Sequence, residues 1–282
     1  MSEREFKRHD DAKSRRKNHG LYVYCIGERE SLTEVFKDAV PTAIEDDASL
    51  ELIEQDELAA VVSPVPLDDY GEDELQSRLG DATWTAVRAM RHEKVVEHFA
   101  RRASVVPLRF GTIYLERARV EQMLSTERAT LRAIIENLRG REEWGLNITY
   151  DRAKLLENII SLSPRLREMS ERARAASPGQ SYLMRKKIDA MRDVEARAET
   201  KRVAGEIERK LSNKSDAAVR LRVLKDEATE QGDVAAKFAF LVERKRFEEF
   251  RAEAERLARE YTSAGFQLEL TGPWPAYNFS MS

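Results

Sequence analysis

The sequence predicts an α+β fold of two ferredoxin-like domains, each with the element order βαββαβ, and a helical hairpin inserted in the second. Three observations carry this prediction. Short runs of β-branched and aromatic residues alternate with longer stretches at helical spacing. The order strand, helix, strand, strand, helix, strand occurs twice along the 282 residues. A chain of this length also suits about two domains.

The first half of the chain holds the first series of elements. Strands are expected at 21–26, 50–54, 58–62, 105–110 and 113–114. Ser31 is the expected cap of a short helix that runs to Ala39. A second helical stretch begins near Glu72 and is interrupted at Gly80-Asp81. After that break, one helix face carries Trp84, Val87, Arg91, Val95 and Phe99.

The second half repeats the order after a connecting helix, with a hairpin as its first helix. Strands are expected at 145–150, 218–223, 237–242 and 266–270, and a helix at 247–261. Helices over 152–176 and 182–211 are joined by the turn Ser177-Pro178-Gly179. Their narrow apolar stripes among alternating charges favour antiparallel packing. The stripe of the longer helix is Met184, Ile188, Met191, Val194, Ala198, Ile207 and Leu211.

The expected domain boundaries follow from these elements. Residues 1–19 carry seven Lys/Arg and four Asp/Glu with little to bury, and are expected to form a disordered basic arm. The remaining boundaries are a ferredoxin-like domain at 20–116, a connecting helix at 117–143, and a C-terminal α+β domain at 144–282 that includes the hairpin and a tail rich in Pro and Trp.

Charge and composition exclude several classes of protein. Lys+Arg 48 against Asp+Glu 51 gives a net charge of −3, so no global field attracts nucleic acid. The single cysteine, Cys25, excludes an intramolecular disulfide framework, suits a reducing cytoplasm, and is expected to be buried in a strand. No apolar run is long enough to span a bilayer, and the N-terminus lacks an apolar signal core. We therefore expect a cytoplasmic protein with no membrane or nucleic-acid partner.

No enzyme signature is present, so no catalytic, cofactor-binding or metal-binding residue is assigned and the chain is expected not to be an enzyme. His92 and His98 are six residues apart on a helix, so their rings point about 120° apart and are read as surface or boundary residues. Two alternatives remain open. One is a small-molecule or metal-dependent enzyme with a deep pocket. The other is an RNA-binding sheet platform that uses Tyr22, Tyr24, Phe238 and Phe240.

Two segments are unusual enough to be candidate interaction sites. In the first, Pro107 lies in a strand-like run and indicates an edge strand, while Gly111 indicates a bulge or a close backbone approach. Such an edge, with Arg109 and Phe110, would accept another chain. The other reading of this segment is a kinked core strand.

The second segment, 270–279, surrounds Trp274 with two prolines and ends with Tyr277 and Phe279. Prolines stiffen the chain and cannot continue a strand ladder. Exposed aromatic side chains would form a sticky patch, so these should pack on something. They are expected either to clamp the protein's own domain junction or to bind a partner directly.

These segments resemble the motifs of the gas vesicle GvpF/GvpL family. Leu-Thr-Gly-Pro-Trp-Pro at 270–275, followed by Tyr277 and Phe279, is similar to the family's closing signature. Residues 107–112 resemble its central motif, and the Tyr22–Tyr24 strand and residues 177–183 also fit. The resemblance covers about residues 20–279. Ala276 departs from it, because the family commonly has a second proline there.

The resemblance implies an accessory or minor structural protein of gas vesicles. Members of the family are expected to bind the small hydrophobic shell protein, and to assist nucleation or prevent its aggregation. Implied partners are the shell protein and other gas vesicle accessory proteins, and the implied location is the gas vesicle. The implied fold is two α+β domains of ferredoxin-like character, with no cofactor.

Overall fold

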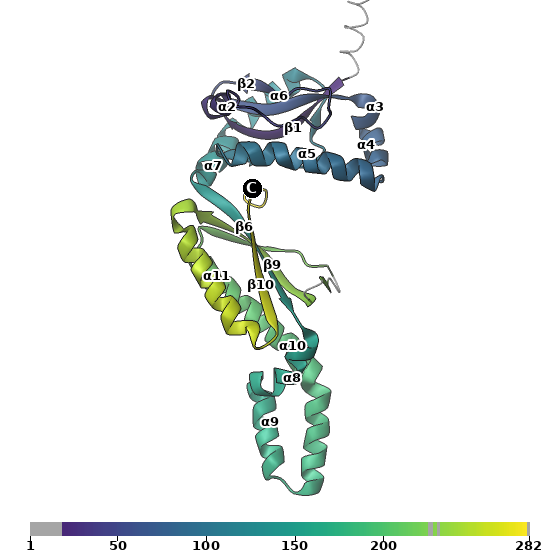
Figure 1. The fold of residues 1–282 in the computed structure, drawn as a ribbon, viewed down its shortest axis with the longest axis vertical. Helices are drawn as coiled ribbons and strands as arrows, with labels where there is room; N and C mark the ends of the chain where they lie inside the picture. Colours follow the sequence, from purple (N-terminus) through teal and green to yellow (C-terminus); the bar gives the residue numbers. More distant parts are fainter. Residues whose placement is uncertain (1–18, 225–227, 230–231, 281–282) are drawn as a thin grey trace, which may run out of the picture. The chain divides into compact units, whose positions relative to one another are not determined.

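The computed structural model describes residues 19–224, 228–229 and 232–280. All of the predicted basic arm except His19 lies outside these residues. Two antiparallel sheets with helices packed on them form the structure, which confirms the α+β prediction (Figure 1). The chain divides into two compact units, which are residues 1–140 with 275–282 (unit 1) and residues 141–274 (unit 2).

The sheet of unit 1 has the strand order β2-β3-β1-β4, and β5 pairs with β1 on the same side as β4. This is the order of a split βαβ arrangement. The strands are β1 His19–Glu28, β2 Glu51–Gln55, β3 Leu58–Pro66, β4 Val105–Pro107 and β5 Ile113–Tyr114. The helices are α2 Arg29–Val35, α3 Leu67–Tyr70, α4 Glu72–Arg78, α5 Ala82–Ala100, α6 Arg117–Thr126 and α7 Arg128–Leu138.

Helices cover both faces of this sheet. One face packs against α2, α3, α4 and α5 through a cluster that includes Tyr22, Tyr24, Val95 and Phe99. The opposite face packs against α6 and α7 through a second cluster, which includes Val23 and Val62. The expected connecting helix is therefore two helices that complete unit 1. Their role follows from the continuous apolar run in β3, which needs cover on both sides.

Two helix predictions in unit 1 need correction. The first helix begins at Arg29 and ends at Val35, and Ser31 lies inside it instead of capping it. On α5, Asp81 accepts hydrogen bonds from the backbone N–H groups of Thr83 and Trp84, which explains the break before it. The predicted apolar face of α5 is also displaced, since Val87 is 42% exposed. The buried residues of α5 are His92, Val95, Val96 and Phe99.

Unit 2 has the sheet order β10-β6-β9-β7, with β8 paired to β9. This again is the split βαβ order, in a second sheet. Its strands are β6 Arg141–Tyr150, β7 Ala217–Leu221, β8 Ala228–Thr229, β9 Gly232–Glu243 and β10 Phe266–Trp274. Its helices are α8 Arg152–Leu162, α9 Pro164–Ala175, α10 Pro178–Ser212, the 3₁₀ turn η1 Arg244–Arg246, and α11 Phe247–Thr262.

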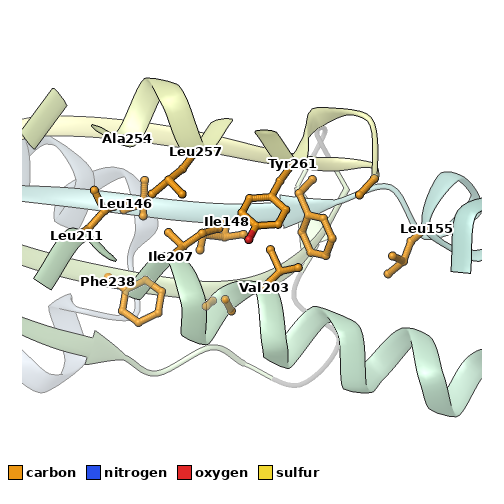
Figure 2. Packing of buried hydrophobic residues seen from close by; sticks show 14 of the residues in the cluster. Leu146, Ile148, Leu155, Val203, Ile207, Leu211, Phe238, Ala254, Leu257 and Tyr261 are labelled. Carbon is orange, nitrogen blue, oxygen red and sulfur yellow. The ribbon is translucent and has the colours of Figure 1, made fainter. Parts of the chain in front are cut away.

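One face of the second sheet holds the core of unit 2. Leu146 and Ile148 of β6 point into a cluster with Leu257 of α11 and Ile207 of α10 (Figure 2). The alternate residues of β6 and β10 include polar ones, such as Asn147, whose side chain donates to Glu269 at 3.3 Å. The alternation of apolar and polar residues in these strands therefore reflects a sheet with one core face.

The inserted hairpin consists of α9 and the first part of α10, which run antiparallel (Figure 1). Ser163 ends α8 and caps α9 through the backbone N–H of Leu166, so the predicted helix over 152–176 is two helices. The apolar stripe of α10 differs from the prediction, since Val194 is 54% exposed and Glu199 takes a buried position. Glu199 is paired with Arg202 at 2.7 Å. Among the described residues, no helix has the length and apolar character needed to cross a membrane.

The C-terminal tail does not belong to the domain that its sequence position suggested. The β10–β6 ladder breaks between Thr271 and Trp274 and then resumes for one pair, Trp274 with Glu143. From Pro275 onward the chain belongs to unit 1. The reason is a set of contacts made by Tyr277, described below, so the polypeptide passes between the units at two points in the chain.

The position of α6 leads to a first prediction. Leu124 is 1% exposed and packs on the sheet of unit 1, so Leu124→Ala should cost about 2–5 kcal/mol of stability. Hydrogen exchange of the β2 and β3 amides should accelerate, while the β6 and β9 amides stay protected. Ser125→Ala, at an exposed neighbouring position, is the control. Unchanged exchange in L124A would mean that α6 is only a connector.

Candidate functional site

His92 of α5 is the centre of a buried polar cluster in unit 1. The residue is 3% exposed. Its Nδ1 lies 2.9 Å from the hydroxyl of Tyr22, on the central strand β1. Its Nε2 lies 3.1 Å from the hydroxyl of Tyr277, in the C-terminal tail. Both ring nitrogens are therefore satisfied by residues that are far apart in the sequence.

The hydrogen bonds extend beyond the imidazole at both ends. The backbone N–H of Gly111 donates to the Tyr22 hydroxyl at 2.9 Å. The Tyr277 hydroxyl donates to Oε2 of Glu93 at 3.1 Å. Each hydroxyl has one proton to give, so the pattern fixes the direction: Gly111 to Tyr22, Tyr22 to Nδ1, and Nε2–H to Tyr277. We assign His92 as the neutral Nε2–H tautomer on this basis.

Burial keeps this cluster uncharged except at its carboxylate end. It lowers the pKa of His92 to about 4, and the Leu108 backbone, which favours the protonated ring, opposes that effect only in part. Burial also raises the pKa of Tyr22 and of Tyr277 well above the ordinary tyrosine value, with the charge of Glu93 adding to the shift at Tyr277. The pKa of Glu93 is raised, because burial outweighs the lowering effect of the hydrogen bond from Tyr277.

Aromatic rings enclose the imidazole. The ring of Tyr24 stacks on it, with centroids 5.9 Å apart and an angle of 21° between the planes. Phe110 meets it edge-on at 5.8 Å. The Tyr24 hydroxyl is itself satisfied by the Ser63 hydroxyl and the Ile44 backbone N–H, both at 2.8 Å. The cluster thus combines apolar packing with complete hydrogen bonding at each buried hydroxyl.

The first candidate segment forms one side of this cluster. Pro107 is the last residue of the edge strand β4, is buried, and pairs with Cys25. The residues after it form a turn instead of the predicted continuous strand. In that turn Arg109 is exposed, Phe110 packs on His92, and Gly111 has a φ of +82°. A side chain is strained at that φ, which explains the glycine.

The second candidate segment is divided between the two units. Tyr277 joins the His92 cluster in unit 1. Trp274 stays on β10 in unit 2, is 49% exposed, and donates from Nε1 to the Thr271 hydroxyl at 3.1 Å. Phe279 is half-buried, and its backbone N–H donates to the carbonyl of Ala276 at 3.3 Å. The structure therefore brings together Phe110, Gly111 and Tyr277, while Trp274 lies elsewhere.

His92, Tyr22 and Glu93 are members of this cluster that the sequence did not predict. The prediction of a surface or boundary position for His92 is wrong, because its side chain is buried. Two signals were present. The positions 92, 95, 96 and 99 repeat at helical spacing, and the Tyr22–Tyr24 alternation places both rings on one face of β1. No local pattern could have joined them to Tyr277, because that contact spans 185 residues.

The hydrogen bonds of this cluster hold α5, β1, the turn at Gly111 and the C-terminal tail together. Neither nitrogen of His92 is free to exchange a proton with a ligand, because each is engaged by a tyrosine hydroxyl. The RNA-platform alternative is wrong, since Tyr22, Tyr24, Phe238 and Phe240 are at most 1% exposed and cannot stack on bases.

Tyr277→Phe tests the cluster. The change leaves Nε2–H of His92 and the Glu93 carboxylate without their partner, so it should cost about 1–3 kcal/mol. We expect faster hydrogen exchange at 276–280 and at Gly111. Tyr182→Phe removes a hydroxyl from a residue that is 59% exposed and serves as the control. Equal exchange in Y277F and wild type would contradict the role given to this hydroxyl.

The pKa of His92 predicts a pH dependence. An unfolded histidine titrates near 6.5, whereas the folded pKa is about 4, so the unfolded state binds more protons between these values. Stability due to neutral His92 is complete above pH 6.5 and falls as the pH drops toward 4, by on the order of 3 kcal/mol. The free energy of unfolding should therefore fall more steeply over this range in wild type than in His92→Gln. Parallel curves would contradict this prediction.

Known proteins have sequences related to this chain over most of its length. A family model described as "Gas vesicle synthesis protein GvpL/GvpF" matches residues 20–281. A gas vesicle protein L from a Streptomyces species is 28% identical over 233 residues, 81% of this chain and 82% of its own length. Gas vesicle protein L1 from Halobacterium salinarum is 23% identical over 270 residues, 93% of this chain and 91% of its own length.

Solved structures show the same fold. The crystal structure of GvpF from an Anabaena species has a TM-score of 0.64 at 18% identity, and covers 94% of this chain and 97% of its own. GvpF from Microcystis aeruginosa has a TM-score of 0.59 at 16% identity, and covers 93% and 99%. With a family model that matches nearly the whole chain, these likenesses lead to one conclusion: the chain belongs to the GvpL/GvpF family of gas vesicle synthesis proteins.

Proposed function

We propose that this chain is an accessory protein of gas vesicle assembly that binds the small hydrophobic shell protein and prevents its aggregation before it enters the shell. Membership of the GvpL/GvpF family supports the gas vesicle role. Under this proposal the chain acts by binding, at the gas vesicle, and other accessory proteins of the same system are further partners.

One observation supports the choice of unit 1 as the binding unit. The two motif segments that resemble the family, 107–112 and 270–279, meet at the His92 cluster, where Gly111 donates to Tyr22 and Tyr277 contacts His92. The turn that they hold leads directly into β5, on the side of β1 where β4 and β5 are the last strands described. A strand edge held in place by a rigid cluster is suited to capture another chain.

The proposed chemistry needs no cofactor and no bond-making step. An unassembled hydrophobic subunit presents apolar surface that would otherwise associate with further copies. Binding to a fixed edge covers part of that surface, and the charged exterior of this chain keeps the complex dispersed. A rigid binding surface also limits the ordering entropy that association costs.

The proposal is tested with the full chain and purified shell protein. Shell protein diluted out of denaturant should scatter light, and an equimolar amount of this chain should lower that scattering at least severalfold and co-elute with the shell protein. Serum albumin at the same concentration is the control for nonspecific coating. Undiminished scattering together with no co-elution would refute the proposed function.

A further inference from the structure

One residue of β5, Ile113, directs its backbone N–H and C=O groups away from β1. Tyr22 is opposite Ile113 and Leu21 opposite Tyr114, and the N–H of Val23 donates to the carbonyl of Thr112 at 2.9 Å. In an antiparallel ladder, hydrogen-bonded and non-hydrogen-bonded pairs alternate. The pair Tyr22–Ile113 is therefore non-hydrogen-bonded, and the N–H and C=O of Ile113 point away from β1. No described strand lies beyond β5 on that side.

A groove flanks β5 on each face of the sheet. One groove, of about 530 Å³, lies against α3 and α4 and is lined by Tyr70, Leu75 and Leu79. The other, also about 530 Å³, lies against α6 and is lined by Tyr114 and Met123. Tyr70 and Leu75 belong to the cluster on one face of the sheet, and Tyr114 and Met123 to the cluster on the other.

The two grooves share the residues of the edge itself. Ile113 and Leu115 line both of them. Leu115 is 67% exposed and Leu79 is 39% exposed, which is unusual for large apolar side chains beside a sheet edge. A strand added to β5 would place alternate side chains on opposite faces, and hence one in each groove.

The charge around the grooves selects among such strands. Their lining includes the carboxylates Glu72, Glu116 and Glu127 but only one cation, Arg119, which donates to Gln122 at 3.2 Å. Glu127 faces the edge closely enough that its charge, after burial, raises the pKa of Tyr114. The rim is therefore net negative and complements a basic segment.

We propose that β5 accepts an extended segment of the shell protein as an added strand, with apolar side chains at alternate positions in the two grooves and at least one Lys or Arg beside the acidic rim. The inference rests on the proposed function for the identity of the partner, and on the β5 geometry for the mode of binding. Pairing at Ile113 aligns the segment, and the grooves and the rim determine which segment binds.

The binding mode is tested with peptides on the full chain. The probe is a peptide with a short run of Val, which places apolar side chains on both faces of the added strand, and two Lys at each end; its comparison carries Glu in place of Lys. Nuclear magnetic resonance titration should shift the amides of Ile113 and Leu115 with the Lys peptide. At low salt the Lys peptide should bind at least tenfold more tightly than the Glu peptide. Equal affinities, or shifts confined to other segments, would overturn the proposal.

A matched pair of variants distinguishes binding at the β5 edge from nonspecific binding to exposed apolar side chains. Leu115→Gln removes apolar surface from both grooves and should weaken Lys-peptide binding about tenfold. Leu183→Gln makes the same change on α10 at a residue that is also 67% exposed, and should leave binding unchanged. Equal behaviour of L115Q and L183Q would overturn the proposal.

The same variants in the light-scattering assay distinguish the two proposals. If wild type and L115Q hold the shell protein equally well, the function stands and the β5 mode is wrong. If the Lys peptide binds at Ile113 but wild type does not hold the shell protein, the edge binds basic strands and the shell protein is the wrong partner. Loss of shell-protein binding in L115Q alone supports both.

Discussion

The requirement to satisfy both nitrogens of one buried imidazole organises unit 1. His92 lies on α5 beneath the sheet, where an unpaired donor or acceptor would cost about 1–3 kcal/mol. Its partners come from the central strand, through Tyr22, and from the C-terminal tail, through Tyr277. Gly111 extends the chain of bonds to the turn before β5. A single buried side chain therefore joins four segments that are distant in the sequence.

That constraint accounts for the path of the chain. The tail leaves the last strand of unit 2 at Trp274 and ends in unit 1 because Tyr277 completes the hydrogen bonding of His92 and Glu93. The positive φ of Gly111 has the same origin, since it places the backbone N–H on the Tyr22 hydroxyl. Two segments that resemble family motifs thus serve one structural purpose, which is to hold the turn that leads into β5.

The two sheets share a strand order but differ in how they are covered. Unit 1 is packed on both faces, by α2 to α5 and by α6 with α7. Its faces are therefore committed to the core, and among the described strands a further strand can join only at the edges of the sheet, which are β2 on one side and β4 with β5 on the other. Under the proposed function, the covered faces make unit 1 rigid, and the β5 edge binds the partner strand. In unit 2 the sheet presents polar side chains such as Asn147 on its second face.

The sequence by itself determined the α+β class, most of the strands and longer helices of both units, and the hairpin, because these depend on local periodicity and caps such as Asp81 and Ser163. It also marked Gly111 and Tyr277 as unusual. Tertiary structure decided that α6 and α7 cover the first sheet, that Val87 is exposed while His92 is buried, and that the tail belongs to unit 1. These outcomes depend on contacts such as His92–Tyr277, across 185 residues, and on which face of a helix meets a sheet. Local propensity does not encode such long-range pairings, since they form only when the whole core packs.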